Sequence, residues 1–175
     1  VCDDGGAEVP TGQPGVIYFE RDAPAFIYHN DPEKTQESRH PGHDTWATVA
    51  DIGYLDDDGY LFLTDRKAFM IISGGVNIYP QEVENVLTLH PEIFDVAVIG
   101  VPHVEMGQEV KAVVQLRDGV APSEKLAAEL IDYVRERLAH FKAPRSVDFV
   151  DELPRSATGK LVKRTLQARY LEAHA

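Results

Sequence analysis

The chain has 175 residues, of which 43% are hydrophobic, and this is enough for one domain or two small ones with modest cores. A formal net charge of -12 argues against nonspecific binding to nucleic acid or to anionic membranes, because phosphate-rich partners would be repelled. No apolar run is long enough to span a bilayer, so no transmembrane segment is expected. Cys2 is the only cysteine, which excludes an internal disulfide and is typical of a protein in the reducing cytoplasm.

Residues 1–65 are rich in Gly, Pro and Asp and contain only short apolar runs, which predicts a mostly β segment. Because the first residues include neither an initiator Met nor a signal peptide, we expect the chain to be part of a longer polypeptide. β-branched and aromatic residues predict strands at 16–19 and 26–28. Asp31, which precedes a proline, predicts the N-cap of a short helix over 33–39.

A hairpin and then a strand, turn and helix are predicted in the middle of the chain. Asp57-Asp58-Gly59 separates two runs of apolar residues, and glycine tolerates the positive φ that a hairpin turn demands. The apolar run at 69–72 predicts a strand, and Gly74-Gly75 lets the backbone turn without Cβ conflict. A helix is expected to begin at Pro80 and to end at His90-Pro91.

Strands and helices alternate in the remaining sequence. Strands are predicted at 95–102, 111–116 and 146–150, and helices from Ser123 to about His140 and from about Val162 onward. The first of these helices carries one apolar stripe, formed by Leu126, Leu130, Ile131, Val134 and Leu138. The sequence therefore predicts an α+β fold in which a β-rich segment precedes a small mixed sheet with a short hairpin and covering helices.

One cluster of polar residues could suggest a metal site. Glu37, His40 and His43 have three-residue spacing, and Asp44 follows them. Pro41-Gly42 would break any helix that aligned these side chains, and no second group of ligands is recognisable. We therefore interpret the cluster as a polar loop and expect no metal site formed by this chain.

Three stretches, taken together, resemble motifs of the adenylate-forming superfamily. Residues 46–54, W-A-T-V-A-D-I-G-Y, resemble its pattern W-x-T-x-G-D-x-G-Y, with Ala50 where Gly is usual. Residues 64–84 resemble D-R-x-K-D-x-I-x-x-G-G-x-N-x-x-P-x-E-x-E, and residues 153–160 contain P-R-x-x-x-G-K. The chain is thus similar to the C-terminal part of an acyl-CoA synthetase of the fatty-acid–CoA ligase type. The methyl group of Ala50 is expected to be tolerated unless that position needs a positive φ.

The resemblance implies roles for individual residues. Asp51 matches the carboxylate that accepts hydrogen bonds from both ribose hydroxyls of ATP, and Arg66 matches an arginine on the ribose and phosphate side of the nucleotide. Lys160 matches the catalytic lysine of adenylation. Ala68 occupies the hinge position, where Lys or Asp is usual, and Gly74-Gly75 matches the wall of the channel for the pantetheine arm of CoA.

The resemblance also implies an organisation and a reaction. Residues 1–66 are expected to end the β-subdomain of the large domain, residues 67–68 to form the hinge, and residues 69–175 to form the small mobile domain. The implied enzyme is an AMP-forming acid–thiol ligase that uses ATP, Mg²⁺ and CoA to activate a carboxylic acid, with a fatty acid expected.

Other readings of the resemblance stay open. They are an aryl-acid CoA ligase, an amino-acid adenylation module and a noncatalytic domain of the same fold. The phosphate loop, the acyl pocket and most of the Mg²⁺-ATP site are expected in an N-terminal large domain outside this sequence. The 175 residues alone are therefore expected to be inactive.

Overall fold

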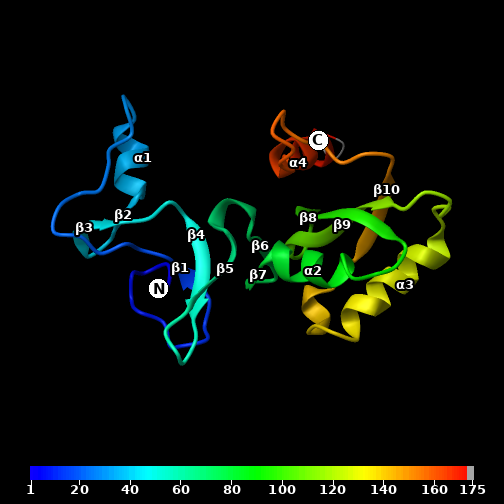
Figure 1. The fold of residues 1–175 in the computed structure, drawn as a ribbon, viewed down its shortest axis with the longest axis horizontal. Coiled ribbons are helices and arrows are strands. Elements are labelled where there is room, and N and C mark those ends of the chain that lie inside the picture. The colour runs from blue at the N-terminus through cyan, green and yellow to red at the C-terminus, as the bar shows by residue number, and fades with distance from the viewer. Residues whose placement is uncertain (173–175) are drawn as a thin grey trace. The chain divides into compact units, whose positions relative to one another are not determined.

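The computed structural model describes residues 1–172. The chain divides into two compact units, Val1–Ala68 and Phe69–Ala175, drawn in blue to cyan and in green to red in Figure 1. Within the described residues no helix has both the length and the apolar character needed to cross a membrane. Each unit is described by itself below.

The first unit is built from two small antiparallel sheets. Strands β1 (Gly15–Val16), β4 (Asp51–Leu55) and β5 (Leu61–Arg66) form one sheet, and β2 (Arg39–His40) pairs with β3 (His43–Ala47) in the other. Its buried apolar residues are few: Cys2, Val16, Ile17, Ala47 and Ile52. The predicted hairpin is confirmed, since β4 and β5 are joined by a turn in which Gly59 has a φ of +81°.

Helix α1 (Pro32–Glu37) confirms the helix predicted after Asp31, whose Oδ1 accepts a hydrogen bond of 3.0 Å from the Lys34 amide. The strand predicted at 26–28 is wrong. The Arg39 guanidinium donates to the carbonyl oxygen of Phe26 and lies over its ring, and the Tyr28 amide donates to Thr35 Oγ1. Side chains therefore satisfy backbone groups that a neighbouring strand would otherwise bind.

The second unit contains a five-stranded sheet. β6 (Ile71–Ser73), β7 (Val76–Ile78), β8 (Ile93–His103) and β9 (Gly107–Leu116) run antiparallel to their partners, and β10 (Ser146–Val150) runs parallel to β9. Three helices accompany it: α2 (Pro80–Leu87), α3 (Glu124–Arg135) and α4 (Lys163–Glu172).

Both faces of this sheet are covered, as Figure 1 shows. Along β8 successive side chains point to opposite faces, so Val96 and Val98 pack in the core with α2 and α3. Ala97 and Ile99 pack on the other face with Leu166 of α4. The near-continuous apolar run of β8 therefore reflects burial on both sides.

The predicted order of elements in this unit is confirmed, with shifts in their limits. β8 and β9 begin before the predicted residues 95 and 111, at Ile93 and Gly107. β6 begins at Ile71, because Lys67–Phe69 forms a 3-10 turn where the apolar run predicted a strand. α3 ends at Arg135 and not near His140, because Ala139 is already extended and the chain turns back to β9, where the Arg145 amide donates to Val110 O at 2.8 Å. α2 ends at Leu87, shortly before the predicted stop.

Candidate functional site

Asp51 and Arg66 are brought together by the β4–β5 pairing. They are direct cross-strand partners, and Arg66 Nε lies 3.2 Å from Asp51 Oδ1. The Arg66 side chain is 66% exposed and that of Asp51 28%, so both can still reach a ligand in solvent. A carboxylate and a guanidinium at this spacing offer hydrogen-bond acceptors for hydroxyl groups beside donors for phosphate or ring oxygens.

The backbone before Asp51 is held in an unusual conformation. Ala50 has a φ of +63°, in the left-handed region, and its amide donates to Thr48 Oγ1 at 2.9 Å. Its carbonyl accepts from the Lys67 amide at 2.8 Å. The position where glycine is usual therefore does need a positive φ in this protein. Gly53 has a different reason to be glycine, because a Cβ there would lie 2.4 Å from the carbonyl oxygen of Phe62.

Ala68 lies between two residues that are each anchored in their own unit. Lys67 Nζ is 2.6 Å from Asp4 Oδ1 in the first unit. On the other side, the Phe69 ring lies 5.6 Å from Lys163 Nζ in the second unit. Ala68 itself is exposed, so its backbone can rotate without disturbing a packed side chain.

Lys160 is carried by a tight, exposed turn between Arg155 and Leu161, which are bridge partners. The Ser156 amide donates to Lys160 O and the Gly159 amide to Ser156 O, both at 2.8 Å. Arg155 Nη1 donates to Gly159 O at 2.6 Å. Among residues 1–172 no carboxylate pairs with the Lys160 ammonium, which is therefore available to an anionic ligand.

Gly74 and Gly75 form the turn between β6 and β7, with φ of +58° and +80°. The Gly74 amide donates to Met106 O at 2.9 Å, and a Cβ on Gly74 would lie 3.1 Å from Met106 Sδ. A Cβ on Gly75 would meet no atom within 4 Å. Backbone conformation favours glycine at both positions, and the turn presents bare backbone to one side.

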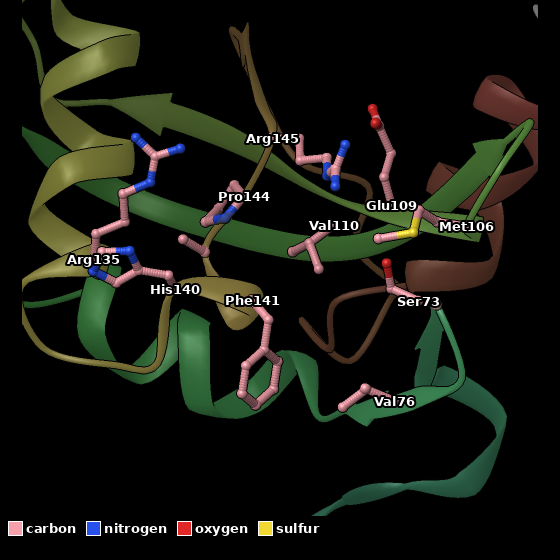
Figure 2. A pocket seen from close by; sticks show the side chains of 12 residues that line it. Ser73, Val76, Met106, Glu109, Val110, Arg135, His140, Phe141, Pro144 and Arg145 are labelled. Atoms are coloured by element: carbon pink, nitrogen blue, oxygen red, sulfur yellow. The ribbon is translucent and has the colours of Figure 1, made fainter.

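A pocket of about 580 Å³ adjoins this turn, between the β6–β7 hairpin, β9 and the segment after α3. Figure 2 shows Arg135 and His140 on one side, Glu109 of β9 and Met106 of the preceding turn on the other, and the Phe141 ring at another edge. The residues that line it are Ser73, Gly74, Val76, Met106, Glu109, Val110, Arg135, His140, Phe141, Ala143, Pro144 and Arg145. The lining combines apolar surface with cationic side chains.

The charges of this pocket favour an anion. Arg135 is paired with Asp132 at 3.0 Å, and Glu109 Oε2 lies 3.7 Å from His103 Nε2. Arg145 makes no ion pair with any other described residue. Its guanidinium therefore remains open to a phosphate group, which it can bind through two parallel hydrogen bonds.

The sequence did not predict this pocket. Arg135 is the last residue of α3, and Arg145 follows a bend ten residues later. Because the helix ends between them, helical periodicity could not predict that their side chains line one pocket. The segment at 141–144 contains the bend that closes the pocket. Asp51 and Arg66 belong to the first unit, whereas the pocket belongs to the second.

The interpretation of Glu37, His40, His43 and Asp44 as a polar loop is wrong, because Glu37 ends α1 and the other three lie in the paired strands β2 and β3. The two histidines have main-chain and aromatic partners. His40 is buried, with Nε2 2.8 Å from Gly6 O and Nδ1 accepting from the Gly42 amide. The His43 ring stacks on Trp46. Within residues 1–172 no group of three His, Cys, Asp or Glu side chains is placed to hold a metal ion.

Comparison with known proteins gives a consistent result. Residues 82–160 match the family described as the AMP-binding enzyme C-terminal domain. The chain is 43% identical over 162 residues to 3-[(3aS,4S,7aS)-7a-methyl-1,5-dioxo-octahydro-1H-inden-4-yl]propanoyl:CoA ligase of Rhodococcus jostii, covering 93% of the chain and 30% of that protein. It is 37% identical to a long-chain-fatty-acid–CoA ligase of Escherichia coli, covering 95% of the chain and 28% of that protein.

A solved structure agrees with these relatives. The anthranilate CoA ligase AuaEII, in complex with anthranoyl-AMP, superposes with a TM-score of 0.84 at 33% identity, over 99% of this chain and 33% of that one. The chain thus spans about 30% of the length of the curated relatives that it matches. By motif, sequence and fold the chain belongs to the adenylate-forming superfamily of acyl- and aryl-CoA ligases, and residues 82–160 form its AMP-binding enzyme C-terminal domain.

Proposed function

We propose that the chain is the C-terminal part of an ATP-dependent CoA ligase that first adenylates a carboxylic acid and then transfers the acyl group to the thiol of CoA. In this proposal residues 1–66 end the large domain, residues 67–68 are the hinge, and residues 69–175 are the mobile domain. The observation that carries it is the exposed, unpaired Lys160 on its rigid turn, in a chain that also brings together Asp51 and Arg66.

In the first half-reaction a carboxylate oxygen of the acid bonds to the α-phosphorus of ATP, and the bond from that phosphorus to pyrophosphate breaks. Two anions approach each other, so a fixed cation stabilises the charge that develops between them. Lys160 is proposed to be that cation. Asp51 accepts hydrogen bonds from the ribose hydroxyls, and Arg66 both orients Asp51 and donates to the nucleotide.

Mg²⁺ is proposed to enter with the ATP phosphates and to be held by residues outside this chain. Residues 1–172 offer no group of three His, Cys, Asp or Glu side chains for it. No step of the mechanism assigned to this chain depends on a metal ligand supplied by it.

In the second half-reaction the small domain turns about Ala68, so that Lys160 leaves the nucleotide and the Gly74-Gly75 turn approaches it. The CoA thiol then attacks the acyl carbon and AMP leaves. Bare glycine backbone suits a wall along which the thin pantetheine arm passes. The adjoining pocket, with Arg135 and the unpaired Arg145, is proposed to bind the phosphate groups of CoA.

A fatty acid is the proposed acid substrate. The E. coli relative, which is 37% identical, is a long-chain-fatty-acid–CoA ligase, and this supports the proposal. An aromatic acid is the second candidate, because the anthranilate ligase is 33% identical with a TM-score of 0.84. Pyrophosphate release by the full-length enzyme, measured with fatty and aromatic acids in parallel, separates the two.

The proposal is tested by separating the half-reactions in the full-length enzyme. Lys160→Ala is expected to slow pyrophosphate release by about 10²–10³-fold, the scale of losing one preorganised charge stabiliser. Thioester formation from presynthesised acyl-adenylate should persist in this variant. Gly75→Leu should do the reverse, because a branched side chain would obstruct the channel.

A matched control exists for the backbone strain that Gly75→Leu introduces. Gly119 has a φ of +85° against +80° for Gly75, and a Cβ at either position would meet no atom within 4 Å. Gly119 lies in the turn after β9 and not in the β6–β7 turn, so Gly119→Leu should leave thioester formation as it is. Equal loss of both half-reactions in folded Lys160→Ala and Gly75→Leu variants would contradict the two-pose mechanism.

A further inference from the structure

A buried ion pair lies beneath the Lys160 turn. Lys163 Nζ is 2.8 Å from Glu84 Oε1, and the two side chains are only 9% and 7% exposed. The same carboxylate oxygen accepts a hydrogen bond of 2.7 Å from the amide of Val98 in β8. Glu84 belongs to α2 and Lys163 to the start of α4, so the pair joins three elements at one point.

This pair fixes the start of α4. Among residues 163–171 of α4 the buried residues are Lys163 and Leu166, and the other side chains are exposed or half-buried. Lys163 follows Lys160 by three residues, and between them the Val162 amide donates to Pro154 O at 2.8 Å. Whatever fixes Lys163 therefore fixes the C-terminal end of the turn that carries Lys160.

The other end of the turn is also tied to β8. Arg155 pairs with Asp95, at the start of that strand, and donates to the Gly159 carbonyl. Residues 156–160 are all exposed, so no packing of their own sets where the turn lies. Its two ends determine its position, and one of them is a buried charge pair.

Stability alone explains this pair poorly. Taking two charges out of water has a desolvation penalty, and apolar pairs of similar volume often hold a core as well or better. A hydrogen-bonded charge pair does something an apolar pair cannot, since it fixes distance and direction at once. We propose that the Glu84–Lys163 pair positions Lys160 for adenylation, an inference that rests on the role of Lys160 proposed above.

The test uses the full-length enzyme with both charges removed. Glu84→Gln keeps an oxygen for the Val98 amide, and Lys163→Met keeps the side-chain length. The double variant is expected to lower kcat for pyrophosphate release by about 10- to 100-fold, the scale of an ångström-sized misplacement of a catalytic group. The KM for ATP and thioester formation from presynthesised acyl-adenylate should each change less than about twofold, since neither uses Lys160. The single variant Lys163→Arg keeps both charges of the pair. It should therefore retain most of the adenylation rate of the parent enzyme.

A control for the loss of an ion pair is Arg137→Met, which breaks the ion pair of 3.2 Å between Arg137 and Glu136 in the same unit. It should leave both half-reactions near the rates of the parent enzyme. In a Lys160→Ala background the double variant should slow adenylation no further, because the pair acts through Lys160. If the double variant is unstable at the assay temperature, the same comparisons are made at a lower temperature at which it is folded, because removing one charge alone would leave the other buried and unpaired.

The outcomes are distinct. Equal slowing of both half-reactions, or a further loss in the Lys160→Ala background, would show that the pair is structural and would overturn the inference. The inference would also be overturned if the double variant adenylated at the rate of the parent enzyme while Lys160→Ala adenylated slowly. If Lys160→Ala leaves the adenylation rate unchanged, the role proposed for Lys160 is wrong, and the inference that depends on it is wrong as well.

Discussion

Ala50 carries backbone strain at the residue beside the nucleotide-binding candidate Asp51. A left-handed conformation costs a residue with a Cβ about 1–2 kcal/mol, and glycine avoids this cost. Ala50 and Asn30 are the non-glycine residues with positive φ in the described part of the chain. The protein thus keeps a methyl group where the superfamily pattern has none, and its turn is held by the hydrogen bonds to Thr48 and Lys67.

Ala50→Gly is therefore expected to stabilise the protein. Relief of the strain outweighs the greater freedom of glycine in the unfolded chain, so the free energy of unfolding should rise by about 1 kcal/mol. Urea denaturation of the full-length protein measures this. Ala25→Gly is the control, because Ala25 is an exposed loop residue of the same unit without a positive φ, and it should lower stability by about 0.4–1 kcal/mol. A similar loss in both variants would mean that the strain at Ala50 is negligible.

At the scale of elements, a polar cluster joins β9, β10 and α4. Lys111 Nζ is 2.9 Å from Asp148 Oδ1 and lies over the ring of Tyr170. Burial favours a raised pKa for the Asp148 carboxyl, but hydrogen bonds from Lys111 and Tyr170 outweigh it and hold that pKa below its ordinary value of 3.8. Burial and the hydrogen bond to Asp148 raise the pKa of Tyr170.

This cluster should make stability depend on acid pH. Because the pKa of Asp148 is lower in the folded state, its contribution is present above about pH 4 and is lost as pH falls through the folded pKa. Asp148 is 40% exposed, so solvent limits the contribution to less than about 1 kcal/mol. In denaturation series between pH 5 and pH 3, Asp148→Asn should lose stability less steeply than the parent. Asp118→Asn controls for the loss of one exposed carboxylate, and identical slopes in all three proteins would exclude the effect.

Sequence signals such as caps and turn glycines predicted the structure well where neighbouring residues determine it. The Asp31 cap and the Gly59 turn both formed as expected, since each depends on nearby residues. The strand expected at 26–28 failed because Arg39, thirteen residues away from Phe26, supplies the bond to its carbonyl. Such long-range side-chain contacts leave no period in the sequence.

For the whole molecule, the proposed mechanism makes Ala68 the hinge about which the two units alternate. The family position usually carries a charged residue, and Ala68 can make no ion pair there. Ala68→Lys in the full-length enzyme should change the ratio of the two half-reaction rates by no more than about fivefold, because an exposed ion pair contributes up to about 1 kcal/mol. Neither half-reaction should be abolished. Ala121→Lys, another exposed alanine, controls for the added charge, and unchanged rates at Ala68 would remove charge from the account of the hinge.

The candidate site was predictable only in part for a related reason. Motif positions indicated Asp51, Arg66 and Lys160 one by one, because each lies in a short recognisable stretch. The pocket beside Gly74 and the Glu84–Lys163 pair were not predictable, since each is assembled by the folding of segments far apart in the sequence. Burial of a charge in particular depends on what covers it, which the sequence order does not reveal.

The hydrogen bond from the Val98 amide to Glu84 also affects how β8 could pair with a strand of a second chain. Within the described residues β8 pairs with β9 alone, so its other side is a sheet edge of eleven residues. Open edges of long apolar strands are templates for strand addition by a second chain. Glu84 occupies one main-chain donor on that edge, and its helix α2 packs against β8. The carboxylate that holds Lys163 thus also leaves one main-chain donor fewer on β8 for a strand of a second chain to bind.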